Sequence, residues 1–298
     1  MCRRDVGSNG HDGAVRRPIA LLLAALLAVS ACSSDDAGDD GGDDTTTTTE
    51  APTTSAGPVA TTTSAPATDV TVDVFFSRDG AVASAGRAVE PPSVARGAME
   101  ALLAGPNDLE AGIGMEATLG EGTRLLGLEV DDGVATVDLS GDFVNDTDAD
   151  LALRVAQVVF TLTQFPTVDR VSILIEGFPT STIGVDAVPA LEVDRSDFEE
   201  QTPAILVESP TPGATVTSPV TVSGVANTFE ANVGYEVTAT DGSVLDDGFT
   251  TATSGSGTRG DFTLTIAPDP GDVTLTVFQE SAEDGSRTDE YVVPLHIG

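Results

Sequence analysis

The sequence is poor in the residues that most often carry catalysis. Tryptophan and lysine are absent, and the 298 residues include only two cysteines, Cys2 and Cys32, and two histidines, His11 and His296. A nucleophile–base pair needs a serine, cysteine or threonine beside a histidine, and zinc needs several histidine or cysteine ligands. The sequence therefore favours a protein that is not an enzyme, and we expect no cofactor.

Positive charge is scarce as well. All 13 basic residues are arginine, against 48 acidic residues, which gives a formal net charge of −35. Binding to nucleic acid depends on clustered basic side chains that contact phosphates. The composition therefore excludes nucleic acid as a partner and favours a soluble, strongly anionic surface.

The amino terminus has the order of an export signal: arginines, then an apolar run from Ile19 to Val29, then small residues. The run is shorter than the ~20 residues that a membrane-spanning helix needs. Val29-Ser30-Ala31-Cys32 resembles the bacterial lipobox, which implies that residues 1–31 are removed and that Cys32 carries a diacylglycerol on the extracytoplasmic side of the cell membrane. An ordinary signal peptide, with Cys32 unmodified, is the alternative.

Residues 32–68 are a low-complexity segment, first rich in aspartate and glycine and then in threonine and proline. Such a composition buries no core, so the segment is expected to be a disordered linker. Its aspartate run is typical of a solvated, self-repelling spacer rather than of a metal site.

The next segment, residues 69–200, alternates strand and helix patterns. Its expected elements are strands at 69–76, 82–89, 126–130, 134–139 and 171–175 and helices at 93–104 and 151–165. The order β-β-α-β-β-α-β predicts an α+β domain in which one sheet carries both helices on one face. Residues 107–122 are expected to be a surface loop, and Leu126, Leu128 and Val130 to be the buried face of a hairpin strand.

Beyond Thr202-Pro203 the pattern changes to strands only. Turn residues such as Asp241-Gly242 separate seven short apolar-patterned runs, which predicts an all-β, immunoglobulin-like sandwich over residues 203–298. The runs are 204–208, 220–226, 233–240, 244–250, 260–266, 273–279 and 291–297.

Motifs in both segments resemble known families. Residues 101–106 (ALLAGP), 132–140 (DGVATVDLS) and 156–166 (AQVVFTLTQFP) look like the GerMN domain, which is named after a sporulation and germination lipoprotein. Residues 222–226 (VSGVA) and 281–286 (SAEDGS) resemble the immunoglobulin-like domain that follows GerMN in spore-germination-type proteins. The resemblance implies no enzyme activity. It implies a role in the cell envelope and a fold similar to that of ring-building motifs of secretion assemblies.

Four residues are candidates for a contact surface. Arg124 and Arg154 are scarce cations in an acidic chain and either pair with carboxylates structurally or line such a surface. Phe229 and Glu230 form either an exposed recognition tip or, for Phe229, a core position beside a turn.

Several carboxylates are candidates for metal binding or catalysis. Asp146, Asp148 and Asp150 have the spacing of a calcium loop, but Leu151 stands where that loop needs glycine, so helix capping is favoured. Asp138 and Glu176 are the remaining acids of interest, and exposure at strand ends is the ordinary interpretation. His296 is expected to be a satisfied or solvent-facing strand residue.

These observations favour a lipid-anchored scaffold that binds other envelope proteins, including copies of itself. A module that binds peptidoglycan or another carbohydrate is the alternative, although aromatic residues, at 4%, are few for stacking on sugars. A hydrolase that uses Asp138 and Glu176 is the least favoured hypothesis.

Overall fold

A computed structural model describes residues 68–145 and 150–298, which belong to one compact unit. The predicted signal peptide, Cys32 and nearly all of the predicted linker lie outside the described residues, and so do Asp146 and Asp148. Within the described ranges, no helix is both long and apolar enough to cross a membrane.

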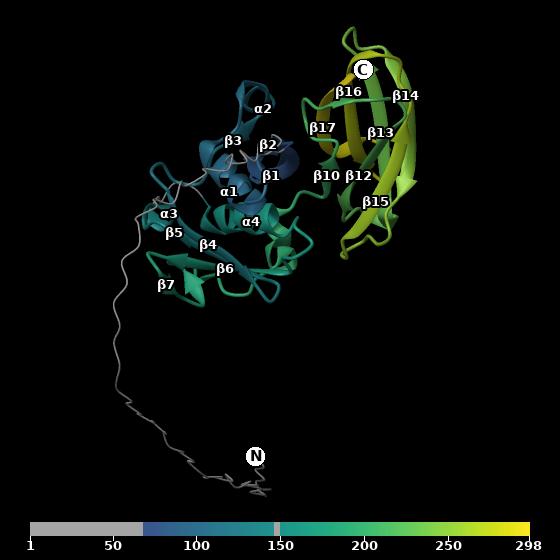
Figure 1. Ribbon diagram of the computed structural model, residues 1–298. Helices are drawn as coiled ribbons and strands as arrows, with labels where there is room; N and C mark the ends of the chain where they lie inside the picture. Colours follow the sequence, from purple (N-terminus) through teal and green to yellow (C-terminus); the bar gives the residue numbers. More distant parts are fainter. Residues whose placement is uncertain (1–67, 146–149) are drawn as a thin grey trace, which may run out of the picture. The chain divides into compact units, whose positions relative to one another are not determined.

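The first part of the described chain mixes helices and strands, and its main elements follow the predicted order (Figure 1). The strands are β1 (Val70–Arg78), β2 (Ala81–Val89), β3 (Met115–Glu116), β4 (Leu125–Asp131), β5 (Val134–Leu139), β6 (Arg170–Ile175), β7 (Phe178–Pro179), β8 (Thr182–Ile183) and β9 (Val188–Pro189). The helices are α1 (Val94–Ala104), α2 (Asp108–Gly112), α3 (Asp142–Asn145), α4 (Leu151–Leu162) and the 3-10 helix η1 (Arg195–Gln201).

The prediction of a single sheet is wrong. The main strands form two sheets, one of order β2-β1-β3 and one of order β4-β5-β6-β7. Helix α4 contacts β1 and β2 of the first sheet and β6 of the second, and Figure 1 shows it between them. Residues 153–162 of α4 are all buried. A helix that is packed on more than one side must be apolar around most of its circumference, which explains the LALRVAQVVFTL sequence.

Side chains at the end of α4 cover the open edge of β1. The Asp73 N–H donates to Gln164 Oε1 at 2.7 Å, and Gln164 Nε2 donates back to the Asp73 carbonyl. The Phe75 N–H donates to Thr161 Oγ1 at 3.1 Å. These groups replace a neighbouring strand along the part of β1 that β3 does not reach, so buried backbone groups there are satisfied.

Two local predictions need correction. Strand β4 is an edge strand, and Leu126 and Val130 are 45% and 40% exposed rather than buried. Residues 107–122 contain α2, where the Asn107 side chain accepts from the Glu110 N–H and Glu110 accepts from the Asn107 N–H. This capping box has the form N-x-x-E, a start signal that the sequence interpretation overlooked.

The second part is an all-β sandwich, as predicted. Its strands are β10 (Ile205–Ser209), β11 (Thr215–Val216), β12 (Val220–Ala226), β13 (Asn232–Ala239), β14 (Val244–Thr251), β15 (Gly260–Ile266), β16 (Gly271–Glu280) and β17 (Arg287–Ile297). They form a three-stranded sheet, β10-β12-β15, and a five-stranded sheet, β11-β17-β16-β13-β14. Each of the seven predicted strands is present, and the short β11 pairs in parallel with β17.

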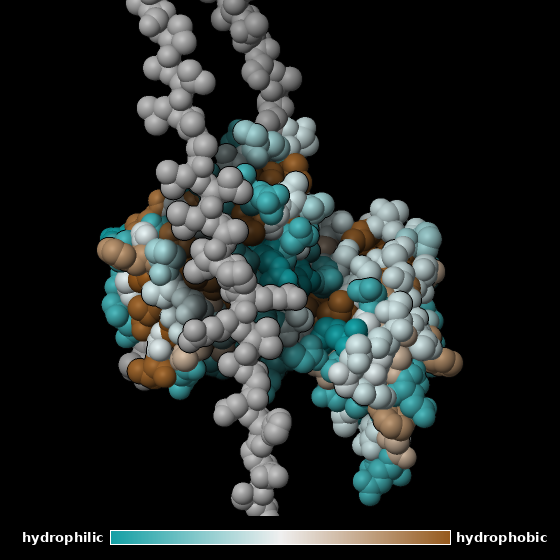
Figure 2. All heavy atoms as spheres, turned by 90° about the horizontal axis from the view of Figure 1, so that it is seen from below, coloured by the Kyte–Doolittle hydropathy of each residue, from teal (hydrophilic) through white to brown (hydrophobic). Residues whose placement is uncertain are grey.

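Buried apolar residues of both parts belong to one core cluster, which includes Phe75 and Val82 of the first sheet and Ile205 and Tyr291 of the sandwich. The surface seen in Figure 2 shows hydrophobic residues, in brown, as separate patches among hydrophilic ones. Scattered surface hydrophobics of this kind are ordinary and do not mark a site. The contacts where the two parts meet are the stronger candidate for one.

Candidate functional site

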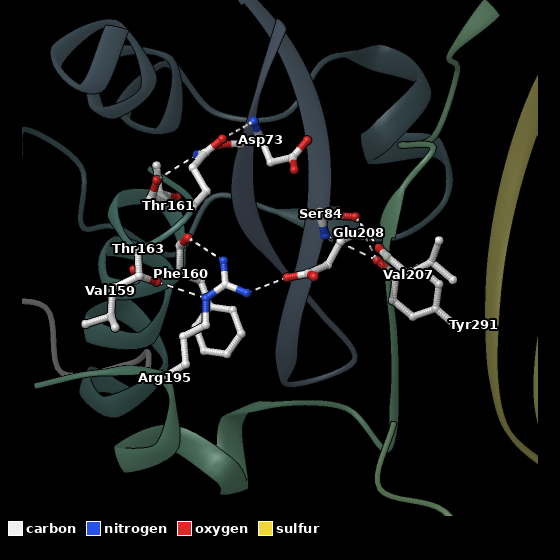
Figure 3. Close-up of polar contacts among 11 residues, drawn as sticks. Asp73, Ser84, Val159, Phe160, Thr161, Thr163, Arg195, Val207, Glu208 and Tyr291 are labelled. Carbon is white, nitrogen blue, oxygen red and sulfur yellow. Dashed lines mark hydrogen bonds and ion pairs between the residues drawn. The ribbon is translucent and has the colours of Figure 1, made fainter. Parts of the chain in front are cut away.

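The junction between the two parts is built around the outer edge of β2. The Ser84 N–H donates to Tyr291 Oη of β17 at 3.2 Å, and Ser84 Oγ donates to the carbonyl of Val207 in β10 at 2.6 Å (Figure 3). Ser84 is fully buried and Tyr291 is 3% exposed. Burial raises the pKa of Tyr291, so its hydroxyl stays protonated. Buried polar groups that satisfy one another fix the relative register of the elements that carry them.

Arg78, at the end of β1, adds a second contact to β17. Its Nη1 donates to the Val292 carbonyl at 3.1 Å, and its guanidinium carbon lies 4.0 Å from the centre of the Tyr291 ring. The Arg78 side chain is almost completely buried. A cation this close to an aromatic face is attracted by the ring quadrupole, most strongly where water is excluded.

Arg195, the first residue of η1, links α4 to β10. Its guanidinium donates to Thr163 Oγ1 at 2.9 Å and to the Phe160 carbonyl at 3.2 Å, and it forms an ion pair with Glu208. Its carbon lies 4.7 Å from the Phe160 ring centre and 5.3 Å from that of Phe75. The Arg195 guanidinium therefore donates through its N–H groups and at the same time lies over aromatic rings with its planar face. The lysine ammonium does not provide this combination.

Asp73 lies beside this ion pair (Figure 3). The pKa of the Asp73 carboxyl is raised to about 6, mainly by burial and further by the Glu208 carboxylate, while Arg195 partly offsets the rise. A carboxyl with such a pKa changes its charge in mildly acidic solution, unlike an ordinary surface aspartate.

A groove of about 730 Å³ opens next to Asp73 and Glu208. One wall comes from β1, β2 and α2 and the other from residues 208–216. Arg87 lines the first wall and binds both carboxylate oxygens of Glu110, at 2.5 and 2.6 Å. The size suits a small ligand or a peptide, but no aromatic side chain is among the described residues that line the groove.

The predicted contact residues are not brought together at one place. Arg124 is exposed at the start of β4. Arg154 is fully buried in α4 and donates to the Phe143 carbonyl at 2.6 Å, so it is not part of an accessible surface. The hypothesis that Arg154 lines a contact surface is wrong, because its side chain is fully buried in a helix that is buried around its circumference.

Phe229 and Glu230 form a turn, η2 (Phe229–Ala231), before β13. Phe229 is 53% exposed and is not a core side chain. Glu230 has a φ of 53°, and its N–H donates to Ser256 Oγ at 3.0 Å. The Phe229 N–H donates to Gln279 Oε1 at 2.5 Å, so two side chains hold the turn in place.

Asp138 and Glu176 both bind backbone amides. Asp138 accepts from the Gly177 N–H at 2.8 Å, and Glu176 accepts from the Gly141 N–H at 2.9 Å. The two acids therefore tie the end of β5 to the turn after β6, which gives each of them a structural task.

Two further sequence hypotheses have a visible outcome. Asp150 caps α4 by accepting from the Ala152 N–H at 2.9 Å, which confirms the predicted capping role. His296 lies on β17 with its Nδ1 2.6 Å from Asp272 Oδ1, as a partly exposed surface pair. In the part of the chain that the structure describes, no group of three or more histidine, cysteine, aspartate or glutamate side chains is arranged to hold a metal ion.

Sequence reasoning missed the junction residues. Ser84 lies in the run AVASAGRAV, where a serine gives no sign that it is fully buried. Tyr291 is one of only two tyrosines in the chain, and buried tyrosine usually has a hydrogen-bond partner. The rarity of tyrosine was the one available signal in the sequence, but it does not show which residue forms a hydrogen bond with Tyr291.

Comparisons with known proteins agree with the motifs. Residues 73–181 match a family described as "Sporulation and spore germination", and residues 204–286 match one described as "Immunoglobulin-like domain of bacterial spore germination". These matches confirm the predicted resemblance, and neither description names an enzyme activity. The search of curated proteins found no match.

Three solved structures are similar over part of their length. The first GerMN domain of the sporulation protein GerM from Bacillus subtilis is 24% identical, over 42% of this chain and 96% of that one, with a TM-score of 0.36. The tandem GerMN domains of the same protein are 20% identical, over 67% of this chain and 61% of that one, with a TM-score of 0.38. A putative lipoprotein from Clostridium perfringens is 17% identical, over 45% of this chain and 93% of that one, with a TM-score of 0.33.

Proposed function

The chain joins a domain of the sporulation and spore germination family to an immunoglobulin-like domain of bacterial spore germination, and from this premise we propose that it is a non-catalytic, lipid-anchored envelope protein that binds other envelope proteins. Cys32 carries the anchor in this proposal, and the two domains form the binding body. The protein acts on the extracytoplasmic side of the cell membrane, in sporulation, germination or a related cell-wall process.

The observation that supports this proposal most directly is the polar junction. Ser84 binds Tyr291 and the Val207 carbonyl of the sandwich. Arg78 binds the Val292 carbonyl, and Arg195 forms an ion pair with Glu208. These contacts are mostly buried, and they join two modules that neither sequence motif nor family description connects with catalysis. A pair of fastened modules presents one composite surface to a partner, whereas loosely linked modules would have to be ordered on binding, which weakens affinity.

Lipid attachment is tested by metabolic labelling with a palmitate analogue. We expect label on the wild-type chain and none on the Cys32→Ala variant, which should also leave the membrane fraction. Equal labelling of the two chains, or no label on either, would contradict the anchor and leave the binding role to be judged separately.

Partner binding is tested by replacing Phe229 with a photo-crosslinking phenylalanine in the native cell. Phe229 is a predicted contact residue and is 53% exposed, and Val185, which is fully exposed, is the matched control position. We expect a discrete adduct from position 229 that position 185 does not give. Identical adduct patterns from both positions, or none from either, would count against protein binding at this tip.

The groove favours a second candidate function, the binding of peptidoglycan or another wall carbohydrate. Its polar walls and its volume of about 730 Å³ are suitable for a glycan segment, although it offers no aromatic face for stacking. Thr71 lies exposed on the wall of the groove, so Thr71→Trp should fill it. Co-sedimentation of the wild-type chain with isolated cell wall, lost in this variant, would establish the alternative in place of the protein-binding role.

A further inference from the structure

Strand β14 has an open edge. It is the last strand of the five-stranded sheet, with β13 on one side. Only its end is covered on the other side, where Thr250 Oγ1 donates to the Thr263 carbonyl at 2.9 Å and the Thr253 N–H donates to the Asp261 carbonyl at 2.8 Å. Among the described residues, no strand pairs with the outer edge of residues 244–249. An unpaired edge is a ready template for another extended chain.

The open stretch carries large apolar side chains in solvent. Val244, Leu245 and Phe249 are 53%, 48% and 73% exposed. Single exposed hydrophobics need no explanation, but three on one six-residue stretch of an open edge form a candidate contact surface. Strand β4 also exposes two such side chains, so a further feature must distinguish the two edges.

That feature is a hollow of about 240 Å³ beside β14, lined by residues of β13, β14, β16 and β17. Phe249 pairs in register with Gly234, and Gly234 pairs with Phe278. A Cβ at position 234 would lie 2.5 Å from the Phe278 ring, so only glycine lets this ring lie across β13. Arg287 lies over the Phe278 ring, with its guanidinium carbon 4.2 Å from the ring centre.

The charges around the hollow are mainly negative. Arg287 is already engaged by both carboxylate oxygens of Glu236, at 3.0 and 2.7 Å. The remaining carboxylates are Glu280, which lines the hollow, and Asp246 and Asp247, which lie on β14 itself. An arriving strand therefore meets uncompensated negative charge beside an exposed aromatic ring, which favours cationic side chains with apolar stems.

The same charges argue against a second copy of this chain as the occupant. Two β14 edges paired with each other would bring four aspartates together, and like charges facing each other across strands are destabilising. The whole chain has a net charge of −35 and no lysine with which to compensate.

We propose that residues 244–249 of β14 and the adjoining hollow bind an extended, basic segment of a partner protein by strand addition. This inference rests on the proposed protein-binding function and names the kind of partner. Backbone hydrogen bonds to the open edge supply affinity, and alternate side chains of the segment meet Phe249 and the carboxylates.

The test uses the full chain in detergent and a fluorescein-labelled peptide of alternating lysine and valine, measured by fluorescence anisotropy. We expect saturable binding that weakens with added salt and that is lost when the lysines are replaced by glutamate. A peptide with N-methyl groups on alternate backbone amides should bind at least about tenfold more weakly, because it cannot complete a strand ladder.

Variants then locate the site. The double variant Asp246→Lys with Asp247→Lys should lose about tenfold or more in affinity, and Phe249→Ser about fivefold. Glu129→Lys reverses one charge on another exposed edge strand, β4, and should change affinity by less than about twofold. Circular dichroism and thermal unfolding of each variant verify that it is folded.

Three results would overturn the inference: equal binding of the N-methylated peptide, unchanged affinity of the double aspartate variant, or a wild-type dimer in sedimentation that Phe249→Ser dissolves, which would make a second copy the occupant. If peptide binding fails while position 229 still gives a specific adduct in cells, the proposed function stands and the assignment to β14 does not. If the peptide binds but no adduct forms at position 229, the assignment to β14 stands and protein binding at the Phe229 turn does not.

Discussion

The three-stranded sheet that contains β1 and β2 and the five-stranded sheet of the sandwich differ in whether their edge strands are covered. In the first sheet, both outer edges are covered: Gln164 and Thr161 pair with β1, and Tyr291 and Val207 pair with Ser84 of β2. In the sandwich, the first six residues of β14 remain uncovered among the described residues. Where an edge is closed, the closing groups stabilise the fold, and where it is open, the exposed groups are available for binding.

The largest effect is expected from reopening the edge of β1 with Gln164→Leu. The Asp73 N–H and carbonyl would both lose their partner in a half-buried place, which should lower the free energy of unfolding by about 3 kcal/mol. Urea denaturation measures this change. Gln164→Glu keeps the acceptor for the Asp73 N–H but sets a carboxylate oxygen against the Asp73 carbonyl oxygen, so at pH 7 it should cost at least as much. A loss below about 1 kcal/mol in the leucine variant would show that this edge does not need to be closed.

The second effect concerns the charge that lies beside the closed edge. The pKa of Asp73 is raised to about 6 in the folded chain from its ordinary value of 3.8. The folded state therefore binds a proton more tightly than the unfolded state, and this group destabilises the fold as pH rises from about 4 to about 6. Asp73→Asn removes that penalty, so the variant should gain up to about 3 kcal/mol relative to wild type at pH 7 and almost nothing at pH 3.5.

Denaturation of both chains at a series of pH values checks this sign. The many other carboxylates affect both chains alike, so the difference between the two curves isolates Asp73. A difference that does not change between pH 3.5 and pH 7 would contradict the raised pKa.

A third, smaller effect is expected at the edge of β2. Tyr291→Phe leaves the buried Ser84 N–H without an acceptor, which should lower the free energy of unfolding by about 1–2 kcal/mol. Tyr235→Phe is the matched control, because Tyr235 is half-buried and no hydrogen bond of its hydroxyl is part of the junction; its loss should be under about 0.5 kcal/mol. Of the contacts with Tyr291, Ser84→Ala keeps this N–H and removes only the 3.5 Å contact between Ser84 Oγ and Tyr291 Oη, so its coupling to Tyr291→Phe should stay below about 0.5 kcal/mol. A loss in Tyr291→Phe no larger than that in Tyr235→Phe would contradict the link.

The smallest effect is expected at the open edge. Phe249→Ser should change the free energy of unfolding by less than about 0.5 kcal/mol, because the side chain is 73% exposed. Phe262→Ser on the neighbouring strand β15 should cost about 3 kcal/mol, since Phe262 is 2% exposed. Thermal and urea denaturation compare the two. Equal losses would show that the β14 edge belongs to the core and is not kept for binding.

Much of the fold was predictable because its signals are local. The strand 260–266 was predicted with its observed bounds, because apolar residues alternate along it and glycine and proline lie near its ends. The capping by Asp150 was predictable for the same reason. The exposed face of β4 was not, because the alternation of Leu126 and Val130 does not reveal that β4 lies at the edge of its sheet.

Little of the site was predictable. Of the four candidate contact residues, Arg154 is buried, Arg124 is exposed next to β4, and Phe229 and Glu230 are exposed together in the turn η2. Ser84, Asp73 and Arg195 became important only through their neighbours. An inspection of residue types cannot rank one serine among many, because what distinguishes Ser84 is the tyrosine that lies against it.

The sequence by itself determined the succession of a mixed α/β segment and an all-β segment, since apolar periodicity and turn residues act over a few positions. Only the tertiary structure decided which strand edges are closed and which are open. The reason is distance along the chain: Gln164 is 91 residues from Asp73, and Tyr291 is 207 residues from Ser84. Such pairs meet only once the whole core has formed.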